Sequence, residues 1–146
     1  MTAFHTGLGA LLIAVNALAG AWGGLQWWRG RHSRAFWPLL RAGQALVILE
    51  AIDGAVLLLE GRELPRLHLI YGLVPLAVSF VAEQLRLAAA DQVLTQRGLA
   101  GRADVERLSQ AEQQGLVRTI LRREMGVMAA SAGVVALLGV RAAGLL

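Results

Sequence analysis

Two histidines near the starts of predicted membrane spans could hold a cofactor. His68 begins the third span with Tyr71 one turn later, and His5 stands just before the first span. Two histidines at one depth on different helices could be the axial ligands of a b-type haem between spans one and three. Nearby small residues would leave room for a flat macrocycle: Gly7, Gly9 and Gly72. The alternative is that both histidines are ordinary interfacial polar groups.

A second group of ionisable side chains lies within the second span. Glu50 and Asp53 share one face of a helix there, and Arg141 of the fourth span lies at a depth comparable with Asp53. Because ionisable groups in hydrocarbon are costly, such carboxylates mark proton or cation pathways. The structural alternative is an Arg141–Asp53 clamp beside a protonated Glu50, with Asn16 of the first span near the level of Glu50.

The opposite face of the second span carries a third polar group. Arg41 and Gln44 lie one turn apart, and Glu83 of the third span lies at a matching depth. We therefore predict a structural ion pair between Arg41 and Glu83, with Gln44 satisfying a remaining lone pair. Arg86, one turn from Glu83, is an alternative partner.

Other chemistry finds little support in the sequence. The chain has no cysteine, which excludes disulfides, thiolate metal sites and cysteine nucleophiles. It also has no Gly-rich phosphate loop and no His-Glu-x-x-His metal spacing, so we expect neither a bound metal ion nor conventional enzyme activity. Although the net charge is +4 and every basic residue is arginine, these arginines separate apolar blocks, so no nucleic-acid partner is expected.

The elements that must position these residues are four membrane-spanning helices. At 146 residues, 56% of them hydrophobic, the chain has room for one all-α domain. Apolar blocks of roughly 20 residues match about 30 Å of hydrocarbon. The predicted spans are 7–28, 36–60, 67–90 and 125–146, with 91–124 as a connection. We expect an integral membrane four-helix bundle whose partner is the lipid bilayer.

Arginine placement predicts the orientation of this bundle. Three arginines lie between spans one and two and six between spans three and four, but only Arg62 and Arg66 lie between spans two and three. The positive-inside rule then places the first and third connections in the cytoplasm and both termini outside, in a bacterial inner membrane. Trp27, Trp28 and Trp37 cluster at the same inner interface, where aromatic rings settle.

Small residues and one capping motif indicate how the helices pack. Gly20-x-x-x-Gly24 in span one and Ala129-x-x-x-Gly133 in span four are ridges that allow close helix contact, either within one bundle or between copies. Ser109 and Glu112 have capping-box spacing and predict a helix in the third connection. That helix would either rest on anionic headgroups or dock a partner. Because spans two and three carry most of the intramembrane polarity, we expect them at the centre of the bundle.

Three segments resemble a group of uncharacterised four-span bacterial membrane proteins. They are Leu67-His68-Leu69-Ile70-Tyr71-Gly72, Ala82-Glu83-Gln84-Leu85-Arg86 and Arg122-Arg123-Glu124-Met125-Gly126-Val127-Met128. This resemblance implies the four-span fold but no activity. The helix pairs are also similar to those of haem-carrying membrane proteins. The expected function is a haem b-binding or accessory subunit in membrane redox chemistry, with quinone, a homo-oligomer or a larger membrane complex as partner. The alternatives are a homo-oligomeric proton or cation pathway and a purely structural or assembly role.

Overall fold

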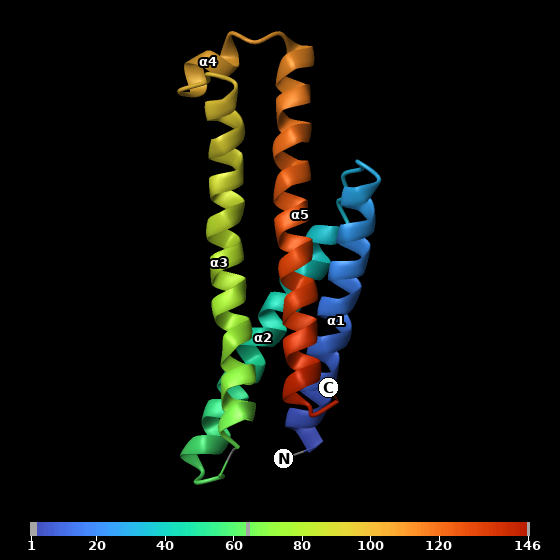
Figure 1. Cartoon of the computed structure of the whole chain (residues 1–146), viewed down its shortest axis with the longest axis vertical. Coiled ribbons are helices and arrows are strands. Elements are labelled where there is room, and N and C mark those ends of the chain that lie inside the picture. The colour runs from blue at the N-terminus through green and yellow to red at the C-terminus, as the bar shows by residue number, and fades with distance from the viewer. Residues whose placement is uncertain (1–2, 64, 146) are drawn as a thin grey trace.

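The described residues form four long helices and one short helix. A computed structural model describes residues 3–63 and 65–145. Its helices are α1 (Ala3–Trp28), α2 (Phe36–Leu59), α3 (Arg66–Gln96), α4 (Arg102–Glu106) and α5 (Gln110–Ala142). Both termini and the α2–α3 connection lie at one end of the bundle, here called the terminal end (Figure 1). The α1–α2 loop and the tall α3–α5 hairpin lie toward the opposite end, the hairpin end.

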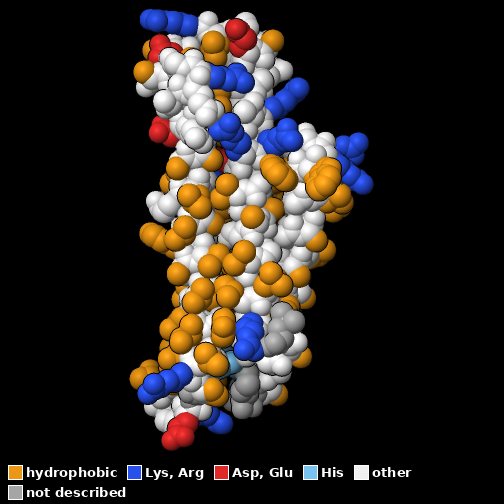
Figure 2. Space-filling view, viewed as in Figure 1, with side chains coloured by type: hydrophobic (Ala, Val, Ile, Leu, Met, Phe, Trp, Pro, Cys, Tyr) orange, Lys and Arg blue, Asp and Glu red, His pale blue; other side chains and the backbone are white. Residues whose placement is uncertain are grey.

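All four long helices are long and apolar enough to cross a membrane, which confirms the four predicted spans. On the face shown in Figure 2, hydrophobic side chains gather over the middle of the molecule, and charged ones gather toward its ends. Many large apolar side chains face outward, such as Leu59 (88% exposed) and Phe80 (66% exposed). Soluble proteins rarely expose so large an apolar surface to water. The fold is therefore that of a multi-pass membrane protein.

Two helices continue well beyond their predicted spans. α3 has 31 residues and α5 has 33, which correspond to lengths of about 46 Å and about 50 Å. Most of the predicted connection 91–124 is thus helical, and Met125, the predicted start of span four, lies in the middle of α5. Hydropathy marks where hydrocarbon ends rather than where a helix ends, and the polar part of α5 is rich in good helix formers such as Gln, Glu, Arg and Leu.

Each long helix ends in the same way. A glycine with positive φ lies two residues beyond the last helical residue in all four cases: Gly30, Gly61, Gly98 and Gly144. At the end of α1, the Gly30 N–H donates to the Trp27 carbonyl (3.0 Å) and the Arg31 N–H donates to the Gln26 carbonyl (2.9 Å). This is the Schellman arrangement, which satisfies carbonyls that the helix leaves unpaired. At the other end of α5, Ser109 and Glu112 form the predicted capping box.

The expectation that spans two and three form the centre of the bundle is wrong. α5 packs extensively against both α3 and α1, whereas α2 lies mainly on α1 and touches α3 and α5 only lightly. The span within α5 is also the most buried of the four. Polar residues indicate where one helix needs a partner, but the small residues of α1 and α5 decide which helices approach closely.

The close approach of α1 and α5 occurs at Gly20. A Cβ atom at this position would lie 2.9 Å from the backbone nitrogen of Gly133 and 3.3 Å from the carbonyl oxygen of Ala129. One turn further, a Cβ at Gly24 would meet no atom within 4 Å. Gly20 and the Ala129–Gly133 ridge therefore serve a contact within the bundle. This α1–α5 seam fixes the depth at which His5 enters the terminal end.

Candidate functional site

His5 forms one side of a polar cluster inside the terminal end. It is the third residue of α1 and is only 3% exposed. Its Nδ1 lies 2.8 Å from Asp53 Oδ2 and 3.3 Å from Glu50 Oε1. Glu50 and Asp53 are three residues apart on α2, so both carboxylates project from one face toward the same ring. Because a carboxylate accepts hydrogen bonds, the proton of neutral His5 belongs on Nδ1.

His68 approaches from α3, where it is the third residue. Its Nδ1 lies 3.0 Å from the carbonyl oxygen of Ala142, the last residue of α5. The last four carbonyls of a helix have no partner within it, and a histidine side chain can supply one. Since a carbonyl only accepts hydrogen bonds, Nδ1 must be the donor, and Nε2 of neutral His68 then carries the lone pair.

The two imidazole rings face one another across the end of the bundle. Their centroids are 5.7 Å apart and their planes are inclined at 59°. Two imidazoles on opposite sides of one metal ion, each at about 2.0 Å through nitrogen, have centroids roughly 6 Å apart. We call His5, Glu50, Asp53 and His68 the histidine site. The separation of the two rings also lies in the range of roughly 4.5–7 Å found for packed ring side chains.

A cavity of about 570 Å³ borders the histidine site and receives residues from all four long helices. Its lining is mainly aliphatic, with His5, Glu50, His68 and Tyr71 as the main polar side chains. Four glycines line the cavity without taking up side-chain volume: Gly9, Gly54, Gly72 and Gly139. Its volume falls within the range of roughly 300–1,000 Å³ that is common for ligand and cofactor sites. We call it the apolar cavity.

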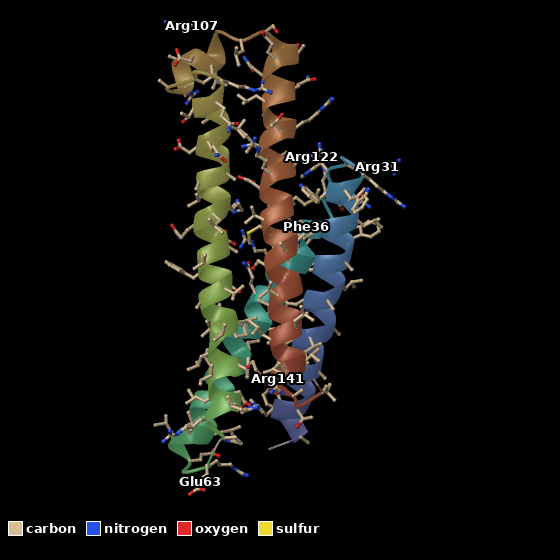
Figure 3. All side chains as sticks on the ribbon, viewed as in Figure 1. Arg31, Phe36, Glu63, Arg107, Arg122 and Arg141 are labelled. Atoms are coloured by element: carbon tan, nitrogen blue, oxygen red, sulfur yellow. The ribbon has the colours of Figure 1, made fainter. Side chains whose placement is uncertain are left out.

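The structure pairs Asp53 with His5, whereas the sequence had suggested an Arg141–Asp53 clamp. Asp53 contacts His5, while the guanidinium carbon of Arg141 lies 5.5 Å from the centroid of the Tyr71 ring. Figure 3 shows Arg141 close to the C-terminal end of α5. Depth along the helices placed Arg141 level with Asp53, but Asp53 contacts His5 and Arg141 lies over the Tyr71 ring.

The third polar group assembles in the half of the bundle nearer the hairpin end. Glu83 forms an ion pair with Arg41, and its Oε1 also accepts a hydrogen bond from Gln44 Nε2 (3.0 Å). Its other oxygen lies 2.9 Å from Arg86 Nε. The structure thus brings both proposed partners to Glu83. Arg86 also lies 3.7 Å from Glu124 of α5. We call these five side chains the arginine–glutamate network: Arg41, Gln44, Glu83, Arg86 and Glu124.

Several contacts were not predicted from the sequence. Asn16, nearly completely buried, donates to the carbonyls of Leu12 (2.9 Å) and Gly43 (3.3 Å), which joins α1 to α2. The sequence signal was present, because a lone Asn in an apolar span next to a glycine on a neighbouring span favours such a contact. The Ala142 carbonyl carried no comparable signal, since any residue type supplies a backbone oxygen.

Comparison with known proteins adds nothing to this geometry. No protein-family model, no curated protein and no solved structure matches the chain. The functional argument therefore depends on the site itself.

Proposed function

We propose that this chain binds b-type haem between His5 and His68 at the terminal end of the bundle. The observation that carries the proposal is the pair of imidazoles from α1 and α3, whose centroids are 5.7 Å apart, with each Nδ1 on a fixed acceptor. Histidine ligands of metals usually donate their other ring N–H to a carboxylate or a backbone carbonyl. His5 has the first kind of acceptor and His68 has the second.

The composition of the site also favours a cofactor that brings its own metal ligands. Among residues 3–63 and 65–145, no group of three or more His, Asp or Glu side chains is arranged to hold a metal ion. Haem needs only one or two protein ligands because the porphyrin supplies four nitrogens. The mainly aliphatic lining of the apolar cavity is suited to a macrocycle, and it would shield the iron from water.

Haem bound in this way would supply one-electron transfer, the usual chemistry of a six-coordinate iron. The chain's own residues would bind and orient it: His5 and His68 as ligands, Asp53 and Glu50 as acceptors that hold the His5 ring. Tyr71 lines the same cavity. We infer that the protein works as a haem-carrying or accessory subunit in membrane redox chemistry, with a quinone or a larger membrane complex as its partner.

We also propose that the terminal end faces outward from a bacterial inner membrane. The support is the excess of arginines at the hairpin end, in the α1–α2 loop and along α3, α4 and α5. The chain lacks cysteine, so a single introduced thiol reports its own side. In intact cells, a membrane-impermeant maleimide should label Glu63→Cys but not His32→Cys. The reverse labelling pattern would contradict this orientation.

A proton or cation pathway through Glu50 and Asp53 is the less favoured function. Both carboxylates are already turned toward His5. Toward the hairpin end, the buried apolar side chains of Leu12, Val47 and Val135 pack into a cluster. On α2, Val47 lies between Glu50 and Gln44, so this apolar cluster interrupts a polar path along the bundle.

The decisive experiment is an absorption titration of the detergent-purified protein with hemin. The wild type should develop the Soret band of six-coordinate haem at a 1:1 ratio. His68→Ala should lose it, and His5→Ala should give an altered, five-coordinate spectrum or no binding. His32→Ala is the matched control, because His32 is exposed in the α1–α2 loop and should bind as the wild type does. A wild type that takes up no hemin, or an equal loss in His32→Ala, would rule out the proposal.

A further inference from the structure

A second cavity opens at the terminal end beside the histidine site. Its volume is about 710 Å³, and it shares His68 and Tyr71 with the apolar cavity. Two guanidinium groups, from Arg62 and Arg141, line it together with one carboxylate, Glu63. We call it the arginine cavity. The two cavities meet at His68 but differ in chemistry, since the first is mainly aliphatic and the second carries two cations.

This pair of cavities matches the two-sided character of haem b. The macrocycle is apolar over most of its area, but one edge carries two propionate groups that are ionised at neutral pH. We propose that Arg62 and Arg141 bind these propionates while the macrocycle lies in the apolar cavity. The inference rests on the proposed haem function and assigns to it two further binding residues. It also orients the cofactor, with its carboxylate edge toward the terminal end.

Contacts within the chain hold the side chain of Arg141 and the backbone of Arg62 in place. Arg141 lies in the last turn of α5 with its guanidinium over the face of Tyr71, a cation–π contact that fixes the orientation of the side chain. Arg62 follows the positive-φ Gly61, and its N–H donates to the Leu57 carbonyl (3.1 Å), which fixes its backbone. A planar guanidinium can bind a carboxylate through two parallel hydrogen bonds, so the residue type suits the group.

Substitution of Glu63 should change hemin binding in the opposite direction from substitution of the arginines. Its carboxylate lines the same cavity, and Figure 3 shows it at the tip of the α2–α3 connection. A negative charge there repels the propionates, so Glu63→Gln should strengthen hemin binding. A general loss of folding could not produce that result.

The test compares hemin with hemin dimethyl ester, whose propionate charges are blocked, by absorption titration of the whole protein in detergent. The wild type should bind hemin roughly tenfold more tightly than the ester, which is the size expected for charge-assisted hydrogen bonds. Arg62→Gln and Arg141→Gln should each weaken hemin binding several-fold and leave ester binding unchanged. Arg62→Lys and Arg141→Lys should keep part of the preference.

The matched control is Arg66→Gln, because Arg66 begins α3 at the same end and does not line the arginine cavity. It should retain the preference of the wild type. Equal affinity of the wild type for hemin and its ester would overturn the inference and leave the haem proposal intact, and so would an equal loss in Arg66→Gln. A wild type that binds neither compound would instead overturn the haem proposal itself.

Discussion

The histidine site and the arginine–glutamate network both join ionisable groups of neighbouring helices, but the polar atoms of the two groups have different surroundings. In the network, Glu83 receives Arg41, Gln44 and Arg86, and no member of the network lines either cavity. In the histidine site, His5 Nδ1 is held by Asp53 and Glu50, and His68 Nδ1 is held by the Ala142 carbonyl. Glu50 Oε2 is buried and has no hydrogen-bond partner within the described part of the chain.

This difference separates a structural role from a binding role. A network whose charges neutralise one another joins helices, because breaking it would leave a charge without a partner. The histidine site instead borders a cavity whose volume is in the range common for ligand sites. The two groups should therefore respond in opposite ways to substitution: the network through stability and the histidine site through binding.

The largest effect should come from removing the carboxylate of the network. Glu83→Leu leaves two guanidinium groups without their shared partner, and we expect a loss of about 3 kcal/mol in the free energy of unfolding. Unfolding by SDS in mixed micelles, followed by circular dichroism, measures it. The double variant Arg41→Leu/Glu83→Leu should recover part of the loss, since Arg86 keeps Glu124. A double variant less stable than Glu83→Leu would contradict the structural role.

The next prediction tests whether folding and hemin binding both depend on the α1–α5 seam. Gly20→Val places a side chain against the backbone of Gly133 and should cost about 2 kcal/mol through overpacking. It should also weaken hemin binding, because displacement of α1 moves His5. Gly24→Val is the matched control on the same helix and should unfold as the wild type does. Equal effects of the two substitutions would show that the seam does not lie where the structure places it.

A smaller effect should separate binding from stability at the histidine site. Asp53→Asn keeps the shape of the side chain but replaces the charged acceptor of His5 Nδ1. Loss of such an outer partner lowers metal-site affinity by roughly 10- to 100-fold, and we expect hemin affinity at the lower end of this range with little change in unfolding. Asp91→Asn, at an exposed position in the hairpin half of α3, is the control. A large loss of stability without loss of affinity would make Asp53 structural.

The smallest effect should be confined to the tip of the hairpin. Hydrogen bonds from the Ser109 hydroxyl and backbone lower the pKa of Glu112 in the folded chain. A lowered folded pKa means that the capping box is stabilising above the unfolded pKa of Glu, about 4.3, and loses this contribution as the pH falls through the folded value. The protection of amides in the first turn of α5, measured relative to their intrinsic exchange rates at each pH, should then fall with acid in the wild type, but not in Glu112→Gln. Hemin binding near neutral pH should be the same in both.

The sequence predicted the elements better than their arrangement. Four apolar blocks and the Ser109–Glu112 capping box follow from local chemistry, and the structure has both. The meeting of Arg41, Gln44 and Glu83 also followed, because matching depths on neighbouring spans leave a buried charge few partners.

Only part of the histidine site could be predicted from the sequence. His5 and His68 were grouped by depth, but Asp53 was assigned to Arg141 because depth alone does not give the direction in which a side chain projects. The Ala142 carbonyl and the two cavities depend on how α5 packs between α1 and α3. That packing includes the close contact of Gly20 with Gly133; the sequence marked both small-residue ridges but did not show that they face one another.

The central position of α5 has a consequence for the order of folding. α5 follows the other three long helices in the sequence, yet it is the helix on which both α1 and α3 pack. The first three spans can enter the membrane in turn, but neither cavity has its full set of walls until the C-terminal residues Gly139 to Ala143 arrive. Both cavities are therefore complete only after this end of α5 has packed between α1 and α3.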